Sequence, residues 1–72
     1  MTRAVIDSGD YILTPCGSLG SKTCVSVVDG GFLGMFDSDD DALQVARRDM
    51  RKRGFYPNIW AVSDHGNIEL VR

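Results

Sequence analysis

One segment of the chain, residues 36–54, carries the full pattern of an amphipathic helix with a defined start and a defined end. Ser38 can accept hydrogen bonds from the free amides of a first helical turn, and Asp41 three positions later completes a pattern close to the capping box. Gly54 suits the left-handed residue that follows a helix. Acidic residues follow the start and basic residues precede the end, which complements the helix dipole. We therefore predict one helix between these two caps.

The predicted helix has a single narrow apolar stripe. Its members recur at spacings of three, four and seven or eight residues and are Ala42, Leu43, Ala46 and Met50. The two alanines are small, so this side of the helix can approach a flat surface closely. A helix with one apolar face has to bury it against another element, and the rest of the chain must supply a sheet.

The segments that flank the helix have the length and composition of strands. They are residues 11–14, 23–28, 32–36, 58–62 and 68–71, with residues 3–6 as a further short edge strand. Pro15 is expected to end the first of them. A chain of 72 residues has room for one domain, here residues 1–72. The predicted fold is α+β, a four- or five-stranded antiparallel sheet packed on one helix in the order ββ(β)αββ.

The first hairpin has a predicted register. Residues 29–30 are Asp-Gly, which favours a two-residue turn of type I′. This turn pairs Val27 with Phe32, and it pairs Val25 with Gly34. The four paired residues then share the face that seats the helix.

The opposite face of the sheet is expected to stay partly apolar, because one helix covers only one side. Leu33 and Met35 are predicted to lie on this second face. Trp60 either joins them or lies under the helix, and the sequence leaves both positions open. Such a face is a candidate surface for a dimer or for another protein.

Composition limits the compartment and the partners. A formal net charge of −2 argues against a general binder of nucleic acid or membrane surfaces. No segment approaches the roughly 18 apolar residues of a membrane span, and the start of the chain lacks the apolar run of a signal peptide, so we expect a cytoplasmic protein. One cysteine pair, Cys16 and Cys24, is a thin framework for a secreted domain, so reduced thiols are expected.

The sequence contains no arrangement typical of catalysis or metal binding. Residues 37–41 imitate the opening of a calcium loop, but Ala42 and Arg48 stand where that loop needs glycine and glutamate. The cysteines and the single histidine lack the short spacing of zinc ligands. We therefore expect no enzyme activity, no metal and no cofactor.

A basic and aromatic cluster marks the end of the helix. Its members are Arg47, Arg51, Arg53, Phe55 and Tyr56. Cations beside stacking rings can hold single-stranded nucleic acid. Basic residues at a helix end also serve the helix dipole, and Asp49 is spaced to pair with Arg53, so a solvated helix end is the competing interpretation.

The second half of the chain resembles an uncharacterised group of small bacterial domains. In that group a hairpin leads through a Phe-x-Ser/Thr-x-x-x-Ala motif into a helix, and a later hairpin turns at Gly-Asn-Ile. The matching residues are Phe36, Ser38, Ala42, Ala46, Gly66, Asn67 and Ile68. In size and layout, without a shared motif residue, the chain also resembles some anti-CRISPR proteins of phages and mobile elements. That likeness implies a small inhibitor without enzyme activity.

The leading functional hypothesis is a non-enzymatic domain that binds and inhibits a protein, such as a host defence complex that handles nucleic acid. The predicted contact residues are the aspartates at the helix start and the apolar residues of the second face: Asp37, Asp39, Asp40, Asp41, Leu33, Met35 and Trp60. The aspartates also stabilise the helix dipole, a role that needs no partner. Two alternatives stay open: a single-stranded nucleic-acid-binding module that uses the basic cluster, and a homodimeric structural protein.

Overall fold

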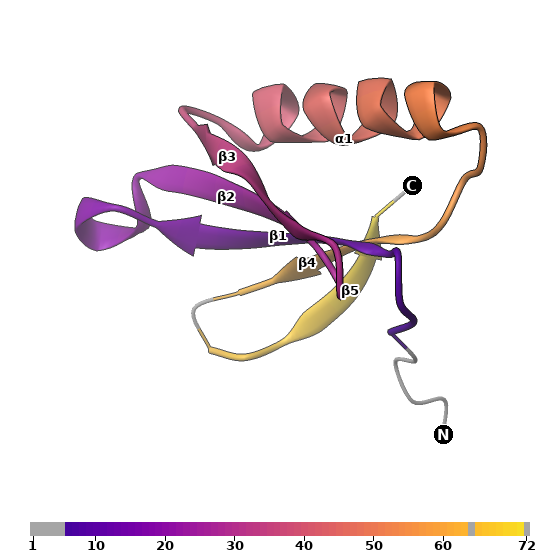
Figure 1. The fold of residues 1–72 in the computed structure, drawn as a ribbon. Helices are drawn as coiled ribbons and strands as arrows, with labels where there is room; N and C mark the ends of the chain where they lie inside the picture. The colour runs from indigo at the N-terminus through magenta and orange to yellow at the C-terminus, as the bar shows by residue number, and fades with distance from the viewer. Residues whose placement is uncertain (1–5, 64, 72) are drawn as a thin grey trace.

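The structure is a computed structural model that describes residues 6–63 and 65–71. Its elements are β1 (Tyr11–Cys16), the 3-10 helix η1 (Ser18–Gly20), β2 (Lys22–Val27), β3 (Gly31–Phe36), α1 (Asp39–Arg53), β4 (Ile59–Val62) and β5 (Ile68–Val71). The strands form one sheet in the order β3-β2-β1-β4-β5, and α1 lies over one side of it (Figure 1). The α+β class and the order of elements along the chain are as predicted.

The sheet is mixed, and the prediction of an antiparallel sheet is wrong. β1 pairs antiparallel with β2, but its other neighbour, β4, runs parallel to it. Tyr11 lies opposite Ile59, and Leu13 lies opposite Ala61. The helix explains this direction, because α1 returns the chain to the end of the sheet where β3 began. β4 therefore runs the same way as β3 and β1.

The helix begins and ends where the sequence predicts. The Ser38 side chain accepts a hydrogen bond of 3.2 Å from the backbone N–H of Asp41. Gly54 ends the helix with a φ of 80°, a conformation that costs glycine little. The acidic first turn and the basic last turn lie at the matching ends of the helix dipole.

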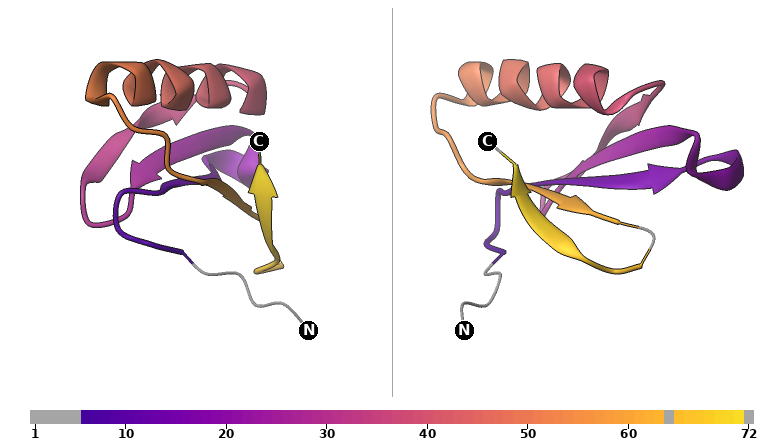
Figure 2. Two further views of the ribbon diagram at one scale, coloured as in Figure 1. Left: turned by 90° about the vertical axis from the view of Figure 1, so that its right-hand side faces the viewer. Right: turned by 180° about the vertical axis from the view of Figure 1, so that it is seen from behind.

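The core lies between α1 and the strands β1 to β3 and includes Ile59 of β4, while the rest of the β4–β5 hairpin turns away from the helix (Figures 1 and 2). The predicted stripe faces it: Ala42, Ala46 and Met50 are buried, and Leu43 is partly buried against the same cluster. The sheet contributes Tyr11 and Val25, both fully buried. The small alanines let the helix lie close to these side chains.

The β2–β3 hairpin has the predicted register at one end only. Val25 pairs with Gly34, as predicted. Phe32 pairs with Ser26, so the predicted pair of Val27 with Phe32 is wrong. A β-bulge separates the two registers.

The bulge follows from a turn that is one residue longer than predicted. Val27 pairs with Gly31, so the turn is residues 28–30. Asp29 within it takes a φ of 59°, and Gly31, the first residue of β3, takes a φ of 115°. Leu33 is left as the extra residue of β3 and packs against the core. Phe32 lies on the other side of the sheet, so the predicted faces of these two residues are exchanged.

The first predicted strand extends further than expected. β1 continues through Pro15 to Cys16. Proline is tolerated there because β4 pairs only with the first three residues of β1, so no hydrogen bond is needed from Pro15 on that side. Of the extra edge strand predicted over residues 3–6, residues 3–5 lie outside the described part, and Ile6 is not in a strand.

The two cysteines form a disulfide, so the expectation of reduced thiols is wrong. Cys16 and Cys24 lie on adjacent strands, β1 and β2, with their Cα atoms 6.1 Å apart. The antiparallel register brings them together, because Cys16 pairs with Lys22, two residues from Cys24 on the same face of β2.

Among the described residues, no helix is long and apolar enough to cross a membrane.

Candidate functional site

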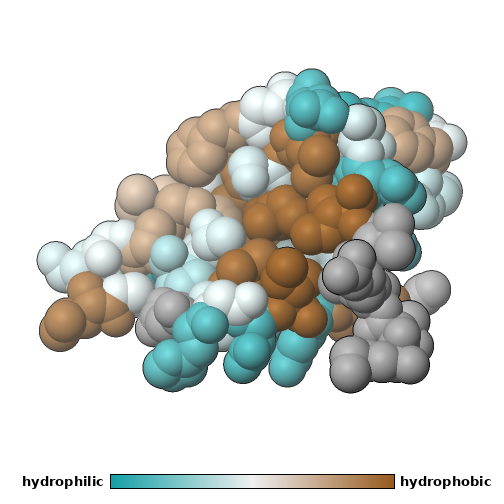
Figure 3. Space-filling model, turned by 90° about the horizontal axis from the view of Figure 1, so that it is seen from below, coloured by the Kyte–Doolittle hydropathy of each residue, from teal (hydrophilic) through white to brown (hydrophobic). Residues whose placement is uncertain are grey.

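The side chains that point away from α1 form two rows across all five strands. By register and strand alternation, one row is Phe32, Ser26, Ile12, Trp60 and Leu70, and the other is Met35, Cys24, Thr14, Val62 and Ile68. We call these ten residues the open face. Hydrophobic side chains gather across the middle of this side of the molecule (Figure 3).

Both margins of the open face expose large apolar side chains. Phe32 is 64% exposed and Met35 53% on β3, and Leu70 is 47% exposed and Ile68 43% on β5. Of the predicted contact residues, Met35 lies on this face and Leu33 packs against the core instead. The contributions of β1 and β5 were missed, although period-two alternation along each strand was the signal that could have found them.

Trp60 faces away from the helix, which decides between the two positions that the sequence left open. Ile59 before it belongs to the core, and the side chain of Trp60 points to the opposite side. It is only 7% exposed, and its indole N–H donates a 2.8 Å hydrogen bond to Asp10. The same carboxylate accepts from the backbone N–H groups of Asn58 and Asp7. Trp60 is therefore the anchored floor of the open face rather than an exposed contact.

The acidic helix start is partly engaged within the chain. Asp37 pairs with Lys22, and this ammonium lowers the pKa of the carboxyl below its usual value. Asp39 accepts a hydrogen bond from the Thr23 hydroxyl of β2. The other two predicted aspartates are exposed at the start of α1. These contacts give half of the acidic cluster a role in attaching the helix to the sheet.

The basic cluster divides into two groups. Arg53 belongs to the first, with its guanidinium carbon 5.3 Å from the centre of the Phe55 ring and 5.9 Å from that of Tyr11. Its Nε atom is also 3.8 Å from the carboxylate of Asp49. Arg53 therefore links the end of α1 to Tyr11 of β1 and to the ring of Phe55.

The Tyr11 hydroxyl donates a hydrogen bond to Asp49, which predicts a loss of stability in alkali. Burial raises the pKa of Tyr11, and the Asp49 carboxylate raises it further. The folded protein thus favours the protonated hydroxyl, a contribution that is complete below the unfolded pKa of about 10 and disappears as the pH rises through the higher folded pKa. Urea unfolding between about pH 8 and 11 should show a falling free energy of unfolding. In Tyr11→Phe this fall should be smaller, and an equal fall would contradict the assignment.

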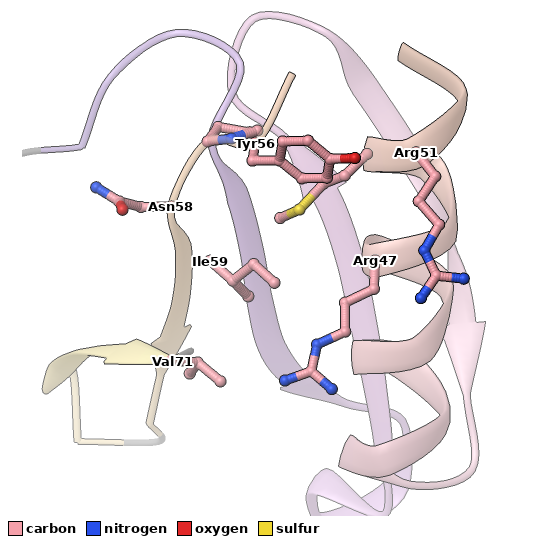
Figure 4. Close-up of a pocket in the computed structure, with 8 residues that line it drawn as sticks. Arg47, Arg51, Tyr56, Asn58, Ile59 and Val71 are labelled. Atoms are coloured by element: carbon pink, nitrogen blue, oxygen red, sulfur yellow. The ribbon is translucent and has the colours of Figure 1, made fainter. Parts of the chain in front are cut away.

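The second group of the basic cluster surrounds a hollow of about 340 Å³ between α1, the loop after it and β5. Arg47 and Arg51 line it from the helix, and Tyr56 lines it from the loop. In Figure 4 the Arg51 side chain runs along the helix, while Arg47 and Tyr56 extend across the space between the helix and the sheet. Three of the five residues predicted as one cluster are thus brought together.

No group of three or more potential metal ligands occurs in residues 6–63 and 65–71. Comparisons of the chain with protein-family models, with curated proteins and with solved structures found no match.

Proposed function

We propose that the protein is a non-enzymatic binding domain whose open face contacts an apolar surface of another protein. The observation that carries this proposal is the exposure of Phe32, Met35, Ile68 and Leu70 on a side of the sheet that α1 does not cover. Exposed apolar side chains on an uncovered face are typical of interaction sites, and here they stand at both margins of the open face.

The composition of the open face supports this proposal. None of its ten residues carries a charge, although a quarter of the chain is charged. Interface cores are depleted in charged residues and enriched in aromatic side chains and methionine, and Phe32, Met35 and Trp60 fit that description. The anchored Trp60 adds a rigid floor, which reduces the entropy lost when a partner binds.

The aspartates at the helix start have a smaller part in this proposal than in the sequence-based hypothesis. Asp37 and Asp39 already have intramolecular partners, so a partner that used them would have to replace those contacts. The proposed partner class is unchanged: a host defence complex that handles nucleic acid, inhibited by a phage or mobile-element protein. Identification of the partner tests this part directly.

The experiment places a photo-crosslinking amino acid at Phe32 and, in a control variant, at Leu19, which is fully exposed on the β1–β2 connection. Both variants are irradiated in nuclease-treated cell lysate, and the captured protein is then purified and titrated with the unlabelled chain. We expect capture at Phe32 and not at Leu19. Leu70→Ser should weaken the purified complex about ten-fold or more, because exposed apolar anchors carry most interface energy. Leu19→Ser makes the same chemical change elsewhere and should leave the affinity unchanged.

Two results would overturn the proposal. One is equal loss of affinity in Leu70→Ser and Leu19→Ser, which would remove the open face from the contact. The other is a stable dimer of the purified chain that Leu70→Ser converts to a monomer, measured by sedimentation, because a second copy would then cover the face. That second result would favour the homodimeric alternative.

A further inference from the structure

The hollow beside the end of α1 has an apolar floor and a polar rim. Met50, Pro57, Ile59 and Val71 form the floor, and Arg47, Arg51, Tyr56 and Asn58 form the rim. Figure 4 shows Tyr56 extending from the loop towards the helix and Arg47 extending from the helix towards Ile59 and Val71. Its volume of about 340 Å³ lies within the range of small-molecule sites, which usually combine apolar walls with a few convergent polar groups.

The charge at this hollow favours an anion. Arg51 lines it together with Arg47, and none of the lining residues within the described part of the chain is acidic, in a chain whose net charge is −2. A second hollow, towards the start of the same helix, is lined instead by Asp39, Asp40 and Glu69. The space beside α1 is therefore basic at one end and acidic at the other. A negatively charged group is attracted to the basic end, where a guanidinium can bind it through two parallel hydrogen bonds.

Tyr56 adds a second requirement, a flat ring. Tyr56 is 72% exposed, although it is aromatic and lies beside the apolar floor of the hollow. The rest of the aromatic cluster is used within the fold, since Phe55 is in contact with Arg53. An exposed tyrosine beside arginines is the combination that binds nucleotide bases and phosphates together.

We propose that this hollow binds a planar heteroaromatic ring that carries a phosphate group. The ring lies against Tyr56 and the apolar floor, and the phosphate is bound by Arg51. A free mononucleotide and the terminal nucleotide of a single strand share this chemistry. The site lies on the helix side of the sheet, so it is separate from the open face and does not depend on the proposed protein partner.

The test is a titration of the folded chain with adenosine 5′-monophosphate, followed by the amide and methyl NMR signals of the lining residues. Adenosine and inorganic phosphate serve as the two halves of the ligand. We expect the monophosphate to bind at least ten-fold more tightly than either half, with the largest shifts at Tyr56 and Met50. A short single-stranded oligonucleotide with a 5′-phosphate distinguishes the sources: tighter binding than the monophosphate indicates a strand end, and weaker or equal binding indicates a free nucleotide.

Matched variants decide whether the monophosphate binds in the hollow. Arg51→Gln and Tyr56→Leu should each weaken the monophosphate at least five-fold, while Arg48→Gln, an exposed position on α1 that does not line the hollow, should change the affinity less than two-fold. Equal weakening by Arg48→Gln and Arg51→Gln would overturn the proposal, because general charge would then explain the binding. The proposal would also be overturned if adenosine 5′-monophosphate bound no more tightly than inorganic phosphate. Neither result affects the crosslinking test at Phe32.

Discussion

Replacing Asp10 with asparagine is expected to lower the free energy of unfolding by about 3 kcal/mol. The carboxylate is 3% exposed and accepts three hydrogen bonds, from the Trp60 indole and from the backbone N–H groups of Asp7 and Asn58. An asparagine side chain has one acceptor oxygen and turns an NH₂ group towards the remaining donors. At least one buried donor then loses its partner, and the segment before β1 is released from β4. For a domain of this size such a loss is a large part of the total stability.

Trp60 provides the measurement, because its fluorescence reports on the same contact. Urea unfolding of Asp10→Asn is compared with that of Asp29→Asn, a carboxylate that accepts a hydrogen bond from Ser8 at the surface. The surface variant should change the free energy of unfolding by no more than about 0.5 kcal/mol. A loss below about 1 kcal/mol in Asp10→Asn would contradict the prediction, because the buried donors would then have found another acceptor.

Reduction of the disulfide is the second large effect that the structure predicts. Cys16 and Cys24 are separated by eight positions, and the chain-entropy relation for a loop of that length gives about 2.5 kcal/mol of stabilisation. The bridge links β1 and β2 on the open face, so its loss also frees the connection that contains η1. Addition of a reductant should therefore lower the urea midpoint of the wild-type chain.

The control for this effect is the double variant Cys16→Ser with Cys24→Ser. It should unfold at about the midpoint of the reduced wild type and should not respond to reductant. A wild-type midpoint that is the same with and without reductant would contradict the prediction. Detection of two reactive thiols in the chain purified without reductant would contradict the disulfide itself.

Local patterns were enough to predict the elements, and they failed where distant segments meet. Ser38, Gly54 and the stripe from Ala42 to Met50 define α1 through bonds and contacts within a few residues, which the sequence displays directly. The parallel contact of β1 with β4 joins Tyr11 to Ile59, and no local pattern records which strand a returning chain will join. The direction of β4 was nevertheless predictable, because a helical crossover returns the chain to run the same way.

The candidate surfaces show the same division. An uncovered apolar face follows from counting one helix against a two-sided sheet, and Met35 could be placed on it by alternation. A one-residue change in the turn after Val27 reversed the positions of Phe32 and Leu33, because every side chain changes face when a register shifts by one. The disulfide required the register of β1 against β2, which brings Cys16 and Cys24 to adjacent positions on one face.

The strand order places β3 at an edge of the sheet, and this has a consequence for the chain on its own. From Gly31 to Phe36 the strand has no charged residue and no proline, which are two of the features that prevent edge strands from pairing with other chains. Its bulge at Leu33 is the one interruption of an otherwise available row of backbone donors and acceptors. The surface proposed for recognition therefore adjoins the strand most exposed to self-association. A partner that covers the open face along β3 would act at the same time as a protective cap, and free chain in excess of that partner would be prone to aggregate.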